Sequence, residues 1–352
     1  MKKFAFYNIF FRIFAAMKML ALQSACLQML LHHPEDGFYR GTRFDHAGVW
    51  DSLLFRGVEL CGRWFPSYDP FMHDAVCGPA EEFSPVFLEG GRILKIGVGL
   101  LQADGAPYDR FKLYPVLDGG QWTVEAGPSS VRFFHRLPGF YEYEKTVALT
   151  GEASFEIRHA LRGSYQGEVY NHNFFTMGKM AVGPSRLVDF PFTPAGTWRA
   201  QYDSVGFTDS GVRFYRPLQE GESVYCGNIH AAAQAEGTSP SASFNWPKSA
   251  ECNAPSALPC AQAEGTSPSA SYNWPKSAEG DVPSAAMGMP YRMSLAEGAF
   301  RVSVEGSVPV SRTVLWANHR IACLEPYNTL SVRPAAPDCW TLCYEIDTID
   351  TQ

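Results

Sequence analysis

The feature that most constrains the fold of this chain is a long succession of short alternating segments, each bounded by glycine, proline or aspartate. In the segment SFEIRHAL, Phe155, Ile157 and Leu161 fall on one face of an extended chain. Glu156 and Arg158 fall on the other face. This period of two is typical of a β-strand with one buried side.

Similar segments fill the chain from about residue 37 onward. One of them, GVWDSLLFRGVELCG, predicts a hairpin that turns at Arg56 and Gly57. Others are RILKIGVGLLQ, KLYPVL, QWTVEA, SVRFFHRL, YEYEKTVALT, RLVDFPF, GVRFYRPL, SVYCGNI, FRVSVEG, RTVLWANHRIACLE and WTLCYEI. No long helical pattern interrupts them, so we expect an all-β protein, built as one large antiparallel β-sandwich.

We expect a single domain over residues 32–352, preceded by an apolar and basic segment, 1–31. That segment reads either as a signal peptide or as residues upstream of a true start at Met17 or Met19. Its apolar run is broken by basic residues and is too short to span a bilayer. We expect a cytoplasmic protein, with a secreted or periplasmic one as the alternative.

An insertion at about residues 231–290 contains a duplicated unit. AQAEGTSPSASFNWPKSAE (233–251) recurs as AQAEGTSPSASYNWPKSAE (261–279). Two copies cannot build a solenoid. The unit is either a tandem duplication within one sheet connection or a paired aromatic arm along a sugar groove.

The charge balance argues against one class of partner. The formal net charge is −7, and no basic stripe with interleaved aromatic residues is present, so we expect no nucleic-acid partner. The nine cysteines include no CxxC pair. We therefore expect free thiols and no structural zinc site. We also expect no other metal and no cofactor.

Two short motifs carry the candidate chemistry. In VYNHNFF, Tyr170, His172 and Phe174 share one strand face, and two asparagines flank the imidazole. In RIACLEPYNTL, Cys323 and Glu325 share a face, and the following proline predicts that the strand ends there, at a sheet rim. Taken singly, each motif also fits a bland alternative: a core histidine bound to a backbone carbonyl, and a solvated strand-end glutamate.

Together these motifs resemble those of a known family, the aldose 1-epimerases of the galactose mutarotase-like superfamily. NHNFF (171–175) is similar to the Asn-His-x-aromatic-Phe signature, and CLEPYNT (323–329) to the Leu-Glu-Pro-aromatic segment of its epimerases. The segments at 37–60 and 73–83 look like those of a poorly characterised bacterial branch. The resemblance extends over about residues 32–352.

The resemblance implies a concave sugar site in which His172 is the general acid and Glu325 the general base. Interconversion of anomers requires a proton delivered to the ring oxygen and another removed from the C1 hydroxyl. A histidine with a pKa of about 6.5 and a glutamate with a pKa of about 4.3 suit these tasks. The partner is then a small-molecule sugar, and no cofactor is needed.

The chain also departs from the family pattern. The family's second histidine has no clear match, and His73 is the nearest substitute. Arg43 is the candidate for the substrate-binding arginine, although pairing with Asp45 explains it equally well. Phe174 stands where the signature has a tyrosine, which removes a hydroxyl.

Three more residues complete the predicted substrate-binding set: Asn171, Glu81 and Glu82. Neighbouring residues on a strand face opposite ways, so only one of the two glutamates can reach a site. The alternative places both in a solvated turn. On the same fold, a non-catalytic carbohydrate-binding or sensor domain is the rival function, and an accessory domain of a polysaccharide lyase or hydrolase is a third.

Overall fold

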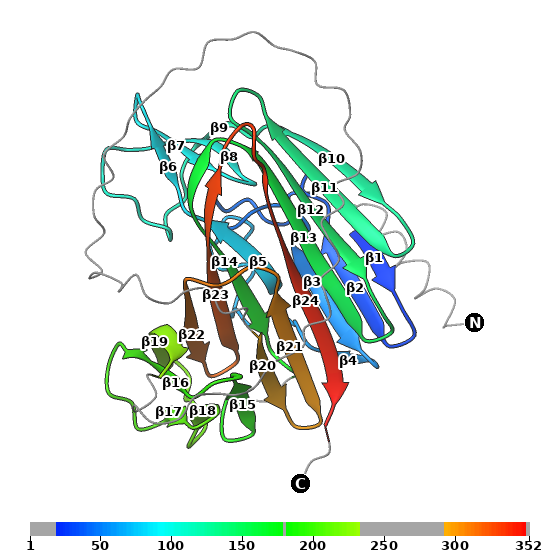
Figure 1. Cartoon of the computed structure of the whole chain (residues 1–352), viewed down its shortest axis with the longest axis vertical. Coiled ribbons are helices and arrows are strands. Elements are labelled where there is room, and N and C mark those ends of the chain that lie inside the picture. Colours follow the sequence, from blue (N-terminus) through cyan, green and yellow to red (C-terminus); the bar gives the residue numbers. More distant parts are fainter. Residues whose placement is uncertain (1–18, 179–180, 233–291, 350–352) are drawn as a thin grey trace.

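The computed structural model describes residues 19–178, 181–232 and 292–349. Over these ranges the chain is built from antiparallel strands, and none of the described residues forms a helix. Two large sheets pack face to face, with two smaller sheets beside them (Figure 1). The expected all-β sandwich is therefore confirmed.

The larger sheet has ten strands in the order β10-β11-β12-β13-β24-β21-β20-β15-β18-β17. Their bounds are β10 Gln121–Ala126, β11 Ser130–Leu137, β12 Tyr141–Leu149, β13 Ser154–Gly163, β24 Asp338–Thr348, β21 Phe300–Gly306, β20 Arg292–Glu297, β15 Arg186–Asp189, β18 Gly211–Phe214 and β17 Val205–Thr208. In β13 the apolar face expected from the sequence is buried, with Phe155, Ile157 and Leu161 inaccessible to solvent.

The second sheet has six strands in the order β16-β19-β22-β23-β14-β5. Their bounds are β16 Pro194–Trp198, β19 Ser223–Ala231, β22 Arg312–Asn318, β23 Ala322–Val332, β14 Tyr165–Phe175 and β5 Gly78–Phe83. Both candidate motifs lie in its centre, because β14 and β23 are neighbours.

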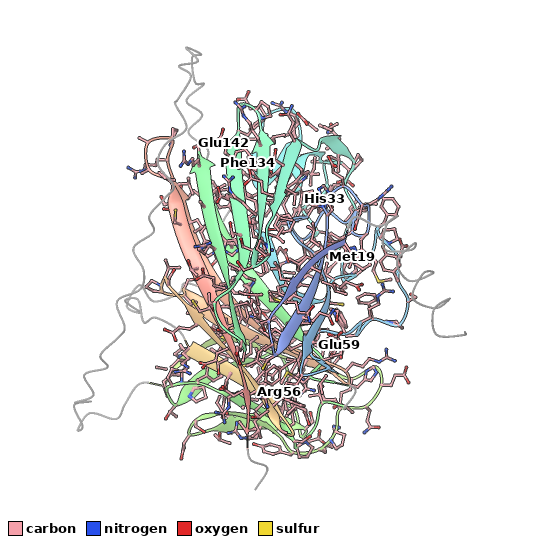
Figure 2. The ribbon with its side chains drawn as sticks, turned by 90° about the vertical axis from the view of Figure 1, so that its right-hand side faces the viewer. Met19, His33, Arg56, Glu59, Phe134 and Glu142 are labelled. Atoms are coloured by element: carbon pink, nitrogen blue, oxygen red, sulfur yellow. The ribbon has the colours of Figure 1, made fainter. Side chains whose placement is uncertain are left out.

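Two four-stranded sheets flank the sandwich. One, next to β14, consists of β6 Val86–Leu88, β7 Arg92–Lys95, β8 Gly99–Gln102 and β9 Val116–Asp118. The other consists of β1 Met19–Gln23, β2 Leu27–His32, β3 Trp50–Phe55 and β4 Val58–Glu59. Figure 2 shows this second sheet, with Met19 and Glu59 labelled, beside the strands that carry Phe134 and Glu142.

The second small sheet changes how the N-terminal segment is understood. Residues 19–31, set apart above as part of a separate segment, form β1 and nearly all of β2. Leu22, Leu27 and Met29 are buried in the main core. The turn expected at Arg56 and Gly57 is present between β3 and β4, and both residues have positive φ, as a two-residue hairpin turn requires.

Two sequence expectations fall partly or wholly outside the described residues. The duplicated unit at 233–251 and 261–279 lies outside them, as do residues 1–18. Among the residues that the structure describes, no helix could cross a membrane.

The six-stranded sheet presents two different faces. The hydroxyl oxygen of Tyr344 in the ten-stranded sheet lies 2.8 Å from Oδ1 of Asn171 and 2.8 Å from Oδ1 of Asn173, so both asparagines point into the sandwich. His172, between them, points to the opposite face. That outer face is covered by segments that connect the strands, and it carries the candidate site.

Candidate functional site

The register of β14 and β23 brings His172 and Glu325 together. Tyr170 pairs with Tyr327 and Asn173 pairs with Leu324, which places His172 directly across from Glu325. The expectation that Glu325 ends its strand at a rim is wrong. β23 continues through Pro326, which lies opposite Thr313 of β22, so Glu325 occupies the middle of a central strand.

The imidazole of His172 lies between two carboxylates. Nδ1 is 3.0 Å from Oε1 of Glu325, and Nε2 is 3.3 Å from Oε2 of Glu82. The exposed fraction of His172 is 1% and that of Glu325 is 7%. Burial lowers the pKa of His172, but the Glu325 and Glu82 carboxylates outweigh it and leave the pKa above its ordinary value.

The two distances do not amount to two well-formed hydrogen bonds. Both ring nitrogens of His172 are buried, and neither has a partner that meets the geometric criteria of a hydrogen bond. The imidazole is thus held at ion-pair distance from two acceptors without an optimal bond to either. Phe44 meets it edge to face at 4.9 Å and Phe174 stacks on it at 5.2 Å.

Arg43 fixes the second carboxylate of the site. Its Nε donates to Oε2 of Glu82 at 2.6 Å, and its NH1 donates to Oδ1 of Asp74 at 2.7 Å. The alternative pairing of Arg43 with Asp45 is therefore wrong. Burial alone would raise the pKa of Glu82, but Arg43 and His172 hold it well below its ordinary value. The alternative that Glu82 lines a solvated turn is wrong too, because Glu82 is buried in β5.

Sequence reasoning missed several residues that surround this pair. Arg110 lies in the segment between β8 and β9, with Nε 3.7 Å from Oε1 of Glu82 and its guanidinium 5.3 Å from the Tyr170 ring. Tyr170 stacks on Tyr327 at 4.2 Å. The two tyrosines could have been found, because each is two residues from His172 or Glu325 on the same strand face. Arg110 gave no such signal, because it comes from an irregular connection.

Asn171 and Glu81 do not meet the other site residues. The Nδ2 of Asn171 donates to Oε1 of Glu81 at 3.1 Å, and both side chains lie inside the sandwich. There Glu81 also contacts Lys145 and, at 3.1 Å, Nε2 of His159. As expected, only one of the two neighbouring glutamates reaches His172. We leave Asn171 and Glu81 out of the proposed site.

His73 lies at the margin of the site and not beside His172. Its Nε2 is 3.0 Å from Oδ2 of Asp74, and its ring contacts that of Phe111 at 5.0 Å. About a third of the His73 side chain is exposed. His73 therefore connects to the buried pair indirectly, for example through Asp74 and Arg43.

One group of side chains at the site has the chemistry of metal ligands. Ligand atoms of His172, Cys323 and Glu325 all lie within 4.8 Å of one another. All three residues are buried, and burial raises the pKa of the Cys323 thiol well above its ordinary value.

Comparison with known proteins identifies the fold. No protein-family model and no curated protein matches the sequence. Among solved structures, the chain is similar to a candidate aldose 1-epimerase from Escherichia coli K12, at 9% identity, with 95% of this chain and 100% of that one covered and a TM-score of 0.52. It is also similar to an aldose epimerase homologue from C. elegans, at 12% identity, with 94% and 99% covered and a TM-score of 0.50.

These identities are low, so the likeness concerns the fold alone. At that level the resemblance read from the sequence motifs is confirmed, because the described residues have the fold of aldose 1-epimerase-like proteins.

Proposed function

We propose that this chain binds a sugar and interconverts its anomers, with His172 as general acid and Glu325 as general base. The observation that carries the proposal is the contact between these two groups. They come from segments far apart in the sequence and meet at 3.0 Å on one face of the sheet. The fold shared with aldose 1-epimerase-like proteins supports the same reading.

An adjacent acid and base suit this reaction. The ring oxygen and the anomeric hydroxyl oxygen of an aldose are bonded to the same carbon, so two neighbouring protein groups can reach both. A sugar whose C1 enters between His172 and Glu325 would take the Nδ1 proton on its ring oxygen. Glu325 would remove the proton of the anomeric hydroxyl. The ring bond then breaks and leaves an aldehyde.

The return step reverses the two roles. After rotation about the C1–C2 bond, the protonated Glu325 donates to the carbonyl oxygen, and the neutral His172 removes the proton of the attacking hydroxyl. Both groups return to their starting states with no net proton change. Glu82, on the Nε2 side, supports the imidazolium form that the first step requires, and Arg43 keeps Glu82 ionised.

A sugar can reach His172 and Glu325 only if the segments that cover this face of the six-stranded sheet move. The segment between β8 and β9 carries Arg110 and Phe111, whose side chains are 41% and 54% exposed at the outer edge of the site. Arg110 faces Glu82 across 3.7 Å, a weak contact for a charged pair. We expect Arg110 to exchange this contact for sugar hydroxyls on binding.

The experiment follows the optical rotation or NMR spectra of freshly dissolved α-aldoses, with and without sugar phosphates in the panel. Wild type should speed equilibration of at least one sugar above the buffer rate. His172→Gln and Glu325→Gln should each lower that rate by about 10²–10⁴-fold. His230→Gln, at an exposed position of β19, is the matched control and should behave as wild type.

One observation favours a second candidate, a sugar-binding domain without catalysis. The acid and base already neutralise each other and are covered, as in a closed structural ion pair. Titration calorimetry with the same sugars separates the candidates. Binding without accelerated equilibration of any sugar would favour this second function and contradict the first.

A further inference from the structure

We propose that His172, Cys323 and Glu325 form a binding site for zinc or a similar thiophilic divalent cation. The three side chains supply one nitrogen, one sulfur and one oxygen ligand. They come from two adjacent strands of the six-stranded sheet: His172 from β14, and Cys323 and Glu325 from β23. This inference does not depend on the epimerase proposal, because it concerns binding alone.

The strand geometry places the three ligands around one point. Cys323 and Glu325 are two residues apart in β23, so their side chains leave the same face of the sheet. Phe174 of β14 pairs with Cys323, and His172 is two residues before it, again on that face. The site therefore rests on rigid, paired strands and not on a loop.

The distances suit a tetrahedral ion. With bonds of about 2.0–2.3 Å and tetrahedral angles, the ligand atoms of a zinc site lie about 3.3–3.6 Å apart. Here the His172 and Glu325 atoms are 3.0 Å apart, and all three ligand atoms lie within 4.8 Å of one another. Side-chain adjustments of about 1 Å would bring them to zinc geometry.

The histidine supplies the second, independent observation. Both ring nitrogens of His172 are buried without a well-formed hydrogen bond, which is rare for a polar group in a protein interior. A metal ion on Nδ1 would satisfy one of them. Glu82 would then accept from the Nε2 proton, the arrangement of carboxylate, histidine and metal that orients many zinc ligands.

The ligand set also selects the kind of ion. A thiolate favours zinc and softer cations and disfavours magnesium and calcium, which prefer oxygen ligands only. The Cys323 thiol must release its proton to bind. Three protein ligands leave a fourth position for water or another small ligand. A loaded ion would occupy both His172 and Glu325 and so block their acid–base use.

The direct test titrates the purified, chelator-treated full chain with Co²⁺, a spectroscopic substitute for zinc. We expect a thiolate-to-cobalt charge-transfer band in the near ultraviolet that saturates at one ion per chain and is abolished by added Zn²⁺. Mg²⁺ should not abolish it. Titration calorimetry with Zn²⁺ alone gives the affinity.

Variants assign the band to this site. Cys323→Ala should remove the charge-transfer band, and His172→Gln should weaken Zn²⁺ binding by at least about 10-fold. Cys343→Ser, which removes an exposed thiol on β24, should leave both unchanged. Circular dichroism confirms that each variant is folded. Absence of the band in wild type, or its persistence in folded Cys323→Ala, would overturn the proposal.

Discussion

At the scale of single residues, the site depends on how charges are compensated around one imidazole. Two carboxylates contact His172, while the guanidinium groups of Arg43 and Arg110 balance the second of them, and Asp74 pairs with Arg43. A buried histidine without such partners would be neutral near pH 7, because burial disfavours the charged form. The pair of carboxylates keeps it available as a proton donor.

This compensation predicts the effect of Glu82→Gln. Loss of the carboxylate beside Nε2 should lower the pKa of His172, since one of the groups that raise it is gone. If His172 is the acid, the alkaline limb of the rate profile should move to lower pH. Stability should fall by up to about 3 kcal/mol, because the buried Arg43 loses one of its two ion-pair partners among the described residues and keeps Asp74.

The measurement is an NMR titration of the His172 ring protons in wild type and variant. Glu168→Gln removes a partly exposed carboxylate of the same strand, paired with Arg312 at 3.2 Å, and serves as the control. An unchanged His172 titration in Glu82→Gln would contradict the role given to Glu82.

At the scale of elements, the two motif strands are joined across a gap in their ladder. No backbone pair is formed between Tyr170–Tyr327 and Asn173–Leu324, where Pro326 has no amide hydrogen to donate. The Asn173 side chain lies beside this gap, and its Nδ2 donates to the Leu324 carbonyl at 2.8 Å. This bond ties β14 to β23 next to the catalytic candidates.

Asn173→Ala should therefore destabilise the fold by about 2 kcal/mol, because the buried Leu324 carbonyl loses its side-chain donor. Urea unfolding measures the change. Thr329→Ala, at an exposed position of β23, is the matched control and should stay within about 0.5 kcal/mol of wild type. Equal stability of the two variants would show that Asn173 does not join the strands.

The same strands show how far the sequence could be read. Alternation placed His172 and Glu325 on defined faces, because a side chain's direction follows from its position in a strand. The alternation could not show that Pro326 lies inside a strand, since that depends on whether the neighbouring strands need a backbone amide hydrogen at this position, which proline lacks. The sequence did not predict Arg110 as a site residue, and it left the ion-pair partner of Arg43 open. Both residues come from irregular segments, whose path is defined only in the folded chain.

At the scale of the whole molecule, a second ionic cluster lies between the two large sheets. Lys145 of β12 contacts Glu81 of β5 and lies 3.7 Å from Asp45, while Tyr143 donates to Asp45 at 2.7 Å. Lys145 of β12 and His159 of β13 both fall at inward-facing positions of alternating strands, which is a signal that the sequence gives for this cluster. One lysine cannot fully compensate two buried carboxylates.

The carboxylates of Asp45 and Glu81 accordingly have different pKa values. Burial would raise the pKa of both. Contacts with Lys145 and His159 bring that of Glu81 down to about 2, whereas burial and the nearby Glu81 raise that of Asp45 to about 7. Between the pKa values of Asp45 in the unfolded and folded chain, Asp45 of the folded chain therefore holds a proton that Asp45 of the unfolded chain, whose pKa is near 3.8, has already lost. The contribution of Asp45 to the stability of wild type should therefore fall as the pH rises from about 4 to about 7.

Asp45→Asn removes this loss. The amide can keep the contacts with Tyr143 and with the backbone amide of Ala47, and it never ionises. The unfolding free energy of the variant minus that of wild type should therefore increase with pH between about 4 and 7, by at most about 1.4 kcal/mol per unit, and then level off. Urea unfolding across this range, at constant ionic strength, measures the difference.

Asp203→Asn, at a surface position, is the control and should give a difference that does not change with pH. A flat difference for Asp45→Asn as well would mean that Asp45 stays ionised in the core, and that Lys145 balances both carboxylates.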